Sequence, residues 1–393
     1  MRFLRLLAAG PFVIPSMLRW ILLVLALGLV ALGSLTVIQS PDWSPWKLAV
    51  LAGEYGHWVA LAPLLVAALA WVSRGDATLV PAATVLVAAV AFGLLLKPVT
   101  EAWLLSDRLP ARLAQQFGHV ELARPAFSLG GLFGRDPAPV AVETLKYSGE
   151  LALDFYRPVR AGANPAPCVI VIHGGGWDGG DRAELAHFNH WLADRGYAVA
   201  SIDYRLAPKF QWPAPREDAG TAIAWLKKNS ATLGIDATRL VLFGRSAGGQ
   251  IAETVGYAAN EPAIRGVIAM YAPSDMVFAY VNAREDDVLK SPTLMRQYLG
   301  GTPDSARDNY ESASALPRVG PATPPTLIVH GELDALVWYR HSVRLDARLA
   351  ERGVPHVFLS LPWATHACEF NLHGPGGQLT TFAVEWFLAA VTK

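Results

Sequence analysis

The stretch that decides the fold is Leu240-Val241-Leu242-Phe243-Gly244-Arg245-Ser246-Ala247-Gly248-Gly249-Gln250. Its first four residues favour a short buried strand, and residues 250–254 favour the start of a helix. Between them, the sequence fits G-x-S-x-G, the pattern of a serine on a sharp strand-to-helix turn. A turn without any chemistry is the alternative, but the strand before it and the helix after it favour a nucleophile. We therefore interpret Ser246 as a candidate nucleophile at the end of a sheet, beside a helix N-terminus.

On either side of this stretch, from residue 141 onward, short apolar segments alternate with amphipathic ones. This alternation predicts an α/β fold, with a mostly parallel sheet covered by helices on both faces. We expect strands at residues 142–147, 151–156, 168–172, 197–202, 240–243, 266–270, 326–330 and 357–361, and helices at 217–229 and 380–391.

A serine nucleophile needs a base, and the base needs an acid that orients it. In a sheet of this kind the partners follow the serine in the order acid, then histidine. Asp334 comes just after the strand at 326–330, on the same edge of the sheet as the serine. It is our candidate acid, and Glu332 is the alternative.

The candidate base is His366, on the loop after the last strand, with His373 as the second choice. His330 lies at the end of a strand, where a structural role is the better interpretation.

A glycine-rich loop, His173-Gly174-Gly175-Gly176-Trp177, directly follows the strand at 168–172. Consecutive glycines let backbone N–H groups turn toward a developing negative oxygen, and the N–H of Ala247 is expected to complete this oxyanion hole. A phosphate-binding loop is the competing reading, but neither G-x-x-x-x-G-K-[ST] nor G-x-G-x-x-G before a helix is present. His173 itself is expected to shape the loop.

Residues from about 140 to 393 resemble the α/β-hydrolase fold and, within it, the hormone-sensitive-lipase-like esterases. The resemblance rests on the glycine-rich loop, the G-x-S-x-G stretch, Asp334 and His366, and on the segment Asp203-Tyr204-Arg205-Leu206-Ala207-Pro208. It implies hydrolysis of carboxylic esters by a triad of Ser246, Asp334 and His366, with no metal and no cofactor. It also implies oxyanion donors at Gly175, Gly176 and Ala247, and a structural role for Asp203 and Asp218.

A long segment, residues 271–325, separates two of the expected strands, and such an excursion is typical of a lid or cap over the site. It contains the charged run Arg284-Glu285-Asp286-Asp287, which we interpret as the solvated surface of a helix.

The first hundred residues differ in texture from the rest. Three apolar runs, at residues 20–38, 58–72 and 77–96, predict an all-α transmembrane region of about three helices, with tryptophans near their ends. Glu54 and His57, just before the second run, are exceptions to an otherwise almost uncharged region. We expect residues 1–100 to be this region, 101–140 a connector with a helix near 111–122, and 141–393 the catalytic domain.

Arginines before the first run, including Arg2 and Arg5, favour a cytoplasmic N-terminus, so three spans would put the catalytic domain on the extracytoplasmic side. Lys97, Arg108 and Arg112 follow the third run and nearly cancel this charge bias. Because every candidate catalytic residue lies beyond residue 170, we expect the spans to anchor the enzyme without supplying catalytic groups. A chain starting near residue 105 is then predicted to keep its activity.

Composition limits the other functions. The formal net charge of the 393 residues is zero, which gives no reason to expect nucleic acid as a partner. Two cysteines, Cys168 and Cys368, exclude a disulfide framework and are expected to be buried.

The expected partners are a small-molecule or lipid-like ester and membrane lipids. Two alternatives remain open: an acyltransferase with the same triad, and a ligand-binding homologue with weak catalysis.

Overall fold

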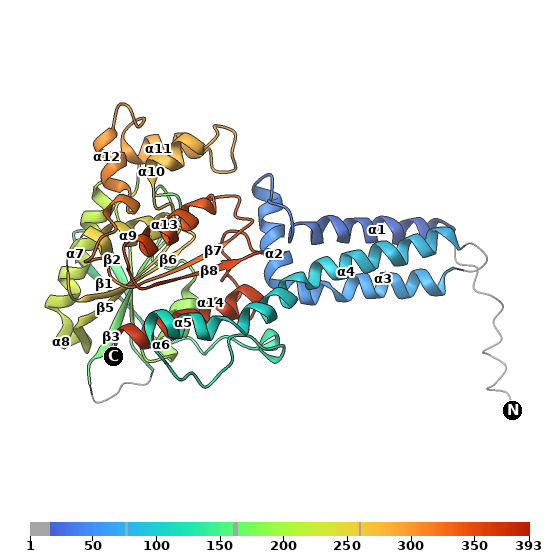
Figure 1. Cartoon of the computed structure of the whole chain (residues 1–393), viewed down its shortest axis with the longest axis horizontal. Coiled ribbons are helices and arrows are strands. Elements are labelled where there is room, and N and C mark those ends of the chain that lie inside the picture. The colour runs from blue at the N-terminus through green and yellow to red at the C-terminus, as the bar shows by residue number, and fades with distance from the viewer. Residues whose placement is uncertain (1–15, 75–77, 160–163, 259–260) are drawn as a thin grey trace.

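The computed structural model describes residues 16–74, 78–159, 164–258 and 261–393. An N-terminal bundle of helices projects from a larger part built around a central sheet (Figure 1). Arg2 and Arg5, which entered the orientation argument, lie outside the described residues.

The sheet has eight strands in the order β1-β2-β4-β3-β5-β6-β7-β8. The pairs β1–β2 and β2–β4 are antiparallel, and all the following pairs are parallel. The predicted α/β fold with a mostly parallel sheet is therefore confirmed. The strands are β1 Val142–Ser148, β2 Leu151–Tyr156, β3 Ala166–Ile172, β4 Ala198–Ile202, β5 Ile235–Arg245, β6 Ile264–Met270, β7 Thr326–Gly331 and β8 His356–Leu361.

Helices cover both faces of the sheet, and the central strands are therefore buried on both sides. One core contains Ala222, Ile251 and Leu345 from the helices of one face, and a second contains Leu113 and Phe387 from the other face. The first face carries α7 Ala214–Lys228, α9 Ala247–Ala258 and α13 Arg340–Glu351, and the second carries α5 Leu109–Phe117, α6 Ala186–Asp194 and α14 Pro375–Val391. Short helices α8 Ser230–Leu233, η1 Gly130–Phe133 and η2 Leu316–Arg318 complete this part.

Three helices follow β6 and stand over one end of the sheet, at the top of Figure 1. They are α10 Met276–Asn282, α11 Ser291–Leu299 and α12 Arg307–Ala313, all inside the segment 271–325. The charged run at 284–287 was expected on a helix, and this is wrong: it forms an exposed turn between α10 and α11. The turn is stabilised locally, since Asp287 accepts hydrogen bonds from the backbone N–H groups of Leu289 and Ser291.

The N-terminal bundle consists of α1 Ser16–Ser34, α2 Trp43–Val59, α3 Leu61–Val72 and α4 Leu79–Ser106. Two of these helices, α1 and α4, are long and apolar enough to cross a membrane, and α2 with α3 forms a pair bent by 56°. The bundle therefore offers two or three candidate spans. Small residues such as Ala26, Ala70 and Ala88 form its seam, while leucines cover its outside.

Several expected boundaries of this region move in the structure. The first helix ends at Ser34, so residues 35–38 form turns, and residues 43–45 belong to α2 instead of a polar link. The boundary expected at residue 100 falls inside α4, whose end packs with Val99 and Ala102 into a core of the sheet. The helix expected at 111–122 is α5, which ends at Phe117.

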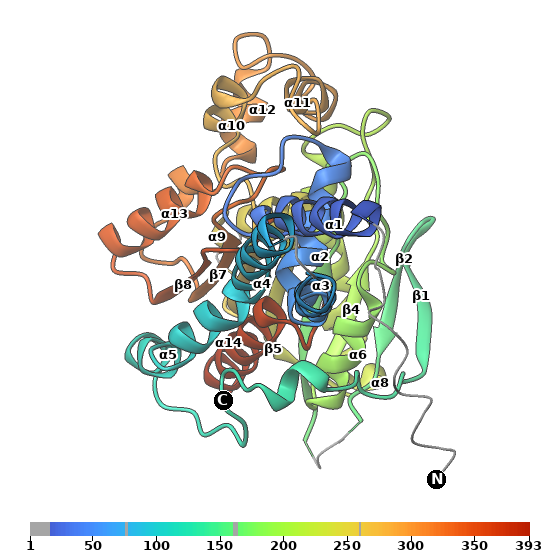
Figure 2. The ribbon, with the colours of Figure 1, turned by 90° about the vertical axis from the view of Figure 1, so that its right-hand side faces the viewer.

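Helix α2 lies across the catalytic-domain ends of α1, α3 and α4, next to the sheet (Figures 1 and 2). Its small buried face, with Ala49, Ala52, Gly53 and Gly56, allows a close approach on one side. Leu48 and Trp58 remain exposed on the other side.

Candidate active site

Ser246 lies at the turn between β5 and α9, with a backbone φ of +51°. Such an angle is strained for a residue with a side chain, and it is typical of functional sites. The turn is tight: a Cβ on Gly244 would lie 2.2 Å from the Gly248 carbonyl oxygen, and one on Gly248 would lie 2.1 Å from that of Ile172. Both glycines of G-x-S-x-G are therefore required by the close approach of the backbone.

Asp334 follows β7 and has both carboxylate oxygens occupied. Its Oδ1 accepts hydrogen bonds from the N–H groups of Leu336 (2.8 Å) and Val337 (2.9 Å). Its Oδ2 lies 2.6 Å from Nδ1 of His366 and 3.0 Å from Nε2 of His330. Burial alone would raise the pKa of Asp334, but the charge of His366 and the hydrogen bonds of both imidazoles outweigh burial and lower that pKa. The carboxylate is therefore ionised when it faces His366.

His366 lies on the loop after β8 and is 7% exposed. Since its Nδ1 faces Asp334, its Nε2 is left for a proton from a nucleophile. The imidazole ring packs against the ring of Tyr271, with centroids 4.1 Å apart. Met270, the residue before Tyr271, accepts a hydrogen bond at its carbonyl from the backbone N–H of Ser246. No hydrogen bond joins Ser246 to His366 among the described residues, and in free enzymes this bond is often long.

His330 is fully buried behind the acid, as its expected structural role requires. Its Nε2 faces two acceptors, Asp334 Oδ2 and the Val337 carbonyl (3.1 Å), so this nitrogen carries the hydrogen. Its Nδ1 then accepts from the hydroxyl of Ser342 at 2.7 Å. His330 thus holds the same carboxylate oxygen, Oδ2, that faces His366.

The two alternatives lie apart from this arrangement. Glu332 is exposed and accepts a hydrogen bond from Ser360. His373 Nε2 pairs with Asp136 at 3.1 Å. The structure therefore brings Asp334 and His366 together, and neither Glu332 nor His373 with them.

The glycine-rich loop turns beside the serine. Gly175 and Gly176 have φ values of +100° and +61°, which glycine adopts without strain. His173 is buried, stacks on Tyr204 at 4.2 Å and shapes the loop from behind, where the Tyr204 hydroxyl donates to the His173 carbonyl. Among the hydrogen bonds of the described residues, none uses the N–H of Gly175, Gly176 or Ala247. These three N–H groups thus have no hydrogen-bond partner within the described residues.

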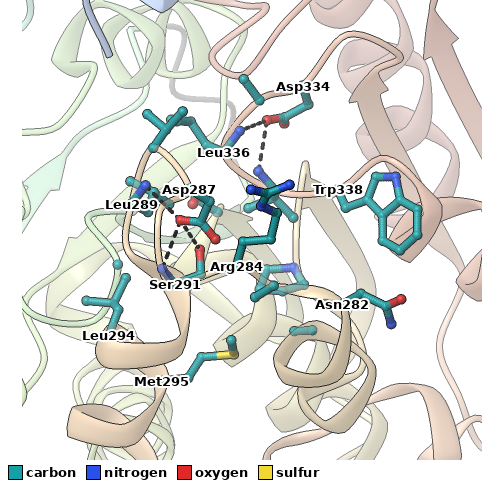
Figure 3. A pocket seen from close by; sticks show the side chains of 18 of the residues that line it. Asn282, Arg284, Asp287, Leu289, Ser291, Leu294, Met295, Asp334, Leu336 and Trp338 are labelled. Carbon is teal, nitrogen blue, oxygen red and sulfur yellow. Dashed lines mark hydrogen bonds between the residues drawn. The ribbon is translucent and has the colours of Figure 1, made fainter. Parts of the chain in front are cut away.

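A cavity of about 510 Å³ lies between this edge of the sheet and helices α10 and α11. Ser246, Ala247, Gly176 and Asp334 line it together, and Figure 3 shows Asp334 and Leu336 facing Leu294 and Met295 across it. The wall is mainly apolar, and charged side chains of the 284–287 turn stand at one side. Such a cavity suits an apolar ligand with one polar reacting group.

Sequence reasoning missed a buried ion pair behind the site. Arg245, the residue before the nucleophile, is 1% exposed and lies 2.8 Å from a Glu369 oxygen. The hydroxyl of Tyr271 donates to the same oxygen at 2.6 Å. The pair connects the nucleophile turn to the loop of His366, and its partners are 124 residues apart, so no local pattern shows it.

His341, on α13, is a second residue that the sequence did not single out. It lines the cavity and packs edge-on against Phe278. Burial lowers the pKa of His341 to about 3, so its imidazole is neutral at ordinary pH. Both cysteines are buried and unbridged, as expected. No group of three or more His, Cys, Asp or Glu within the described ranges is arranged to hold a metal ion.

The sheet, the strained serine turn and the acid–histidine pair define an α/β-hydrolase. Residues 153–349 match the model of the BD-FAE family, which is half of the chain, and the protein belongs to that family. The resemblance inferred from the motifs is thereby confirmed.

Several known proteins are similar to this chain. Esterase LipC of Mycobacterium tuberculosis is 30% identical over 278 residues, covering 67% of this chain and 64% of LipC. Esterase LipQ of the same organism is 29% identical, covering 56% of this chain and 54% of LipQ. The solved structure of a Pyrobaculum calidifontis esterase has a TM-score of 0.55 at 23% identity, covering 75% of this chain and 95% of that one. The chain therefore spans less than two thirds of these curated relatives, and the solved structure supports the fold alone.

Proposed function

We propose that the protein is a membrane-anchored serine hydrolase that cleaves carboxylic esters through an acyl-enzyme. One observation carries the proposal: a strained serine shares its cavity with an aspartate that is bonded to a histidine at 2.6 Å. Relatives named esterases support the same reaction class.

In this mechanism the Ser246 oxygen attacks the ester carbonyl carbon, and its proton moves to Nε2 of His366. The negative oxygen that forms accepts hydrogen bonds from the N–H groups of Gly175, Gly176 and Ala247. Asp334 holds the imidazole in the tautomer that accepts this proton and stabilises the imidazolium. His366 then gives the proton to the leaving alcohol. Water repeats the sequence on the acyl-enzyme and releases the acid.

The substrate class follows from the cavity. Its apolar wall, with Leu289, Leu294, Met295 and Leu336, favours an ester with an apolar acyl or alcohol group. The neutral His341 adds no charge there at neutral pH. We therefore propose apolar, lipid-like esters as substrates.

The location follows from the bundle. Helices α1 and α4 would each cross the bilayer, and α3 would return the chain between them, while α2 lies against the catalytic domain. Three crossings put the start of α1 and the catalytic domain on opposite sides, in line with their places in Figure 1. The charge rule then favours an extracytoplasmic catalytic domain. A C-terminal tag that external protease removes from intact cells would support this orientation, and complete protection of the tag would contradict it.

The direct test of the chemistry is Ser246→Ala in the full-length protein. Hydrolysis of a chromogenic short-chain ester should fall by several orders of magnitude, while membrane binding and the thermal melt stay unchanged. Ser305→Ala, at an exposed position of the cap segment, is the matched control and should keep full activity. Near-normal turnover in Ser246→Ala would exclude the mechanism.

A further inference from the structure

The segment between the first two helices of the bundle reaches the edge of the sheet that carries the site. Residues 35–42 connect α1 to α2, and Gln39, Ser40 and Pro41 line the same cavity as Ser246. The connection is held in place: the hydroxyl of Thr36 donates to the Gly33 and Leu94 carbonyls at 2.8 and 3.0 Å. Part of the cavity wall thus comes from the membrane region.

A first contact joins this connection to the loop of the candidate acid. The side-chain amide of Gln39 donates a hydrogen bond to the main-chain carbonyl of Asp334. The same short loop supplies the two N–H groups, from Leu336 and Val337, that hold the Asp334 carboxylate. A bond to the main chain of Asp334 therefore acts on the orientation of the carboxylate that faces His366.

A second contact joins α2 to the loop of the candidate base. Glu54 is 2% exposed, and its carboxylate accepts hydrogen bonds from the N–H groups of Gly376 (3.1 Å) and Gly377 (3.2 Å) at the start of α14. Its main-chain carbonyl accepts from the side-chain amide of Asn371 at 3.1 Å. The residues bonded to Glu54 thus belong to the segment that begins with His366.

The contact extends along α2. Ala49, Val50, Gly53 and Glu54 enclose a small space together with residues 364–368, which include His366. A Cβ on Gly53 would touch the Trp363 ring at 3.7 Å. Helix α2 therefore lies directly behind the loop that presents the imidazole.

We propose that the α1–α2 segment, residues 36–54, is part of the active site, and that Gln39 and Glu54 are positioning residues for Asp334 and His366. The inference rests on the proposed serine-hydrolase function. A mere attachment of the catalytic domain to its anchor would need apolar contact only. A carboxyl group is costly to bury without hydrogen bonds, and Glu54 is buried where its partners are the N–H groups that follow the histidine loop.

The test uses substitutions of the same size in the full-length protein. Gln39→Glu removes the donor toward the Asp334 carbonyl, and Glu54→Gln replaces one of the two oxygens that face the first N–H groups of α14 by an NH2 donor. We expect kcat on a chromogenic ester to fall about threefold for Gln39→Glu and about tenfold for Glu54→Gln, with KM changed less than twofold, because misplaced catalytic groups affect the chemical step. The midpoint of the pH–rate profile should also shift, since it reports the His366–Asp334 pair.

The controls make the same chemical changes at exposed positions, Gln115→Glu on α5 and Glu150→Gln in the β1–β2 turn. Both should behave like the wild type. If Gln39→Glu and Glu54→Gln keep kcat and the pH profile of the wild type, the inference is wrong. If Glu54→Gln does not show a cooperative melt, Gln39→Glu decides alone.

A fluorophosphonate that labels active serines separates this inference from the proposed function. Slower labelling of Ser246 in the two variants than in the wild type supports the inference. Equal labelling rates overturn it. No labelling of wild-type Ser246 contradicts the serine-hydrolase mechanism itself.

Discussion

The helical bundle and the catalytic domain differ in where they place apolar and polar side chains. The bundle places apolar side chains outward, with Leu79 85% and Val72 76% exposed, and packs small residues inside. The catalytic domain buries polar groups and pairs them, as in the Arg245–Glu369 ion pair. An apolar outer surface of this kind suits the proposed place in a bilayer, because hydrocarbon offers no partner to polar groups, whereas the catalytic domain supplies such partners in its own core. Helix α2 combines both, with exposed Trp58 on one side and buried Glu54 on the other.

The largest expected effect tests the catalytic side of this comparison. Asp334→Asn should lower turnover by about 10⁴, the size that the wrong imidazole tautomer causes in serine proteases. Glu332→Gln, at the exposed alternative, should change turnover little. Steady-state kinetics on a short-chain ester measures both variants. The reverse order of effects would move the acid to Glu332.

The second prediction concerns a polar group in the core of the catalytic domain. Burial raises the pKa of Glu253, on α9, to about 8, and the hydrogen bond from Ser274 opposes this only in part. The folded pKa lies above the unfolded value, so the unfolded state loses its proton first as pH rises. Stability therefore falls between about pH 4.5 and pH 8 and is flat above.

The Glu253→Gln variant has no ionisable group at this position, so its stability should not fall with pH in this way. At pH 9 we expect it to be more stable than the wild type by about 2 to 5 kcal/mol, with no such gain at pH 4. Thermal melts of both proteins at pH 4, 6 and 9 in the same detergent measure the difference. A parallel decline of both melting temperatures would show that Glu253 is ionised in the folded protein.

The third prediction concerns the boundary between the two parts. From the sequence we expected a chain starting near residue 105 to keep its activity, and the structure leads to a different expectation. Such a chain lacks Gln39 and Glu54 and loses the core contacts of Val99 and Ala102. If it still folds, judged by circular dichroism and a cooperative melt, its kcat on a water-soluble ester should be about tenfold or more below that of the full-length enzyme. An unchanged kcat would restore the reading of the bundle as an anchor only.

The sequence predicts the parts of this molecule whose signals are local. The strands of the parallel part, β3 to β8, are largely buried and give mostly apolar runs, and the more exposed edge strands β1 and β2 were also expected at their places. All eight strands were thus found, although β5 extends from residue 235 to 245 instead of 240 to 243. The serine turn, the acid after β7 and the histidine after β8 also depend on neighbours in the chain. The catalytic roles of Ser246, Asp334 and His366 remain predictions until they are tested.

What the sequence does not show depends on contacts between distant segments. Gln39 and the Asp334 carbonyl are 295 residues apart, and Glu54 and Gly377 are 323 apart. Glu54 stood out in the sequence as a charge beside an apolar run, which marks a functional site in a membrane segment. Only the fold shows that its partners are the backbone groups of α14.

The smallest expected effect lies on the outer surface of the bundle. Leu65 on α3 and Leu86 on α4 are 61% and 67% exposed, so in a bilayer they contact lipid. Leucine in lipid gains little over alanine, because lipid tails are as apolar as the side chain. Leu65→Ala and Leu86→Ala should therefore leave ester hydrolysis and the melting temperature nearly unchanged.

Gly33→Leu is the contrasting variant at the seam, where a Cβ would lie only 2.9 Å from Cβ of Leu94. It should separate α1 from α4, lower the melting temperature and, through the displaced α1–α2 connection, reduce kcat. If Leu86→Ala lowers kcat and melting temperature as much as Gly33→Leu, that face binds protein instead of lipid, and the contrast between the two parts of the molecule is wrong.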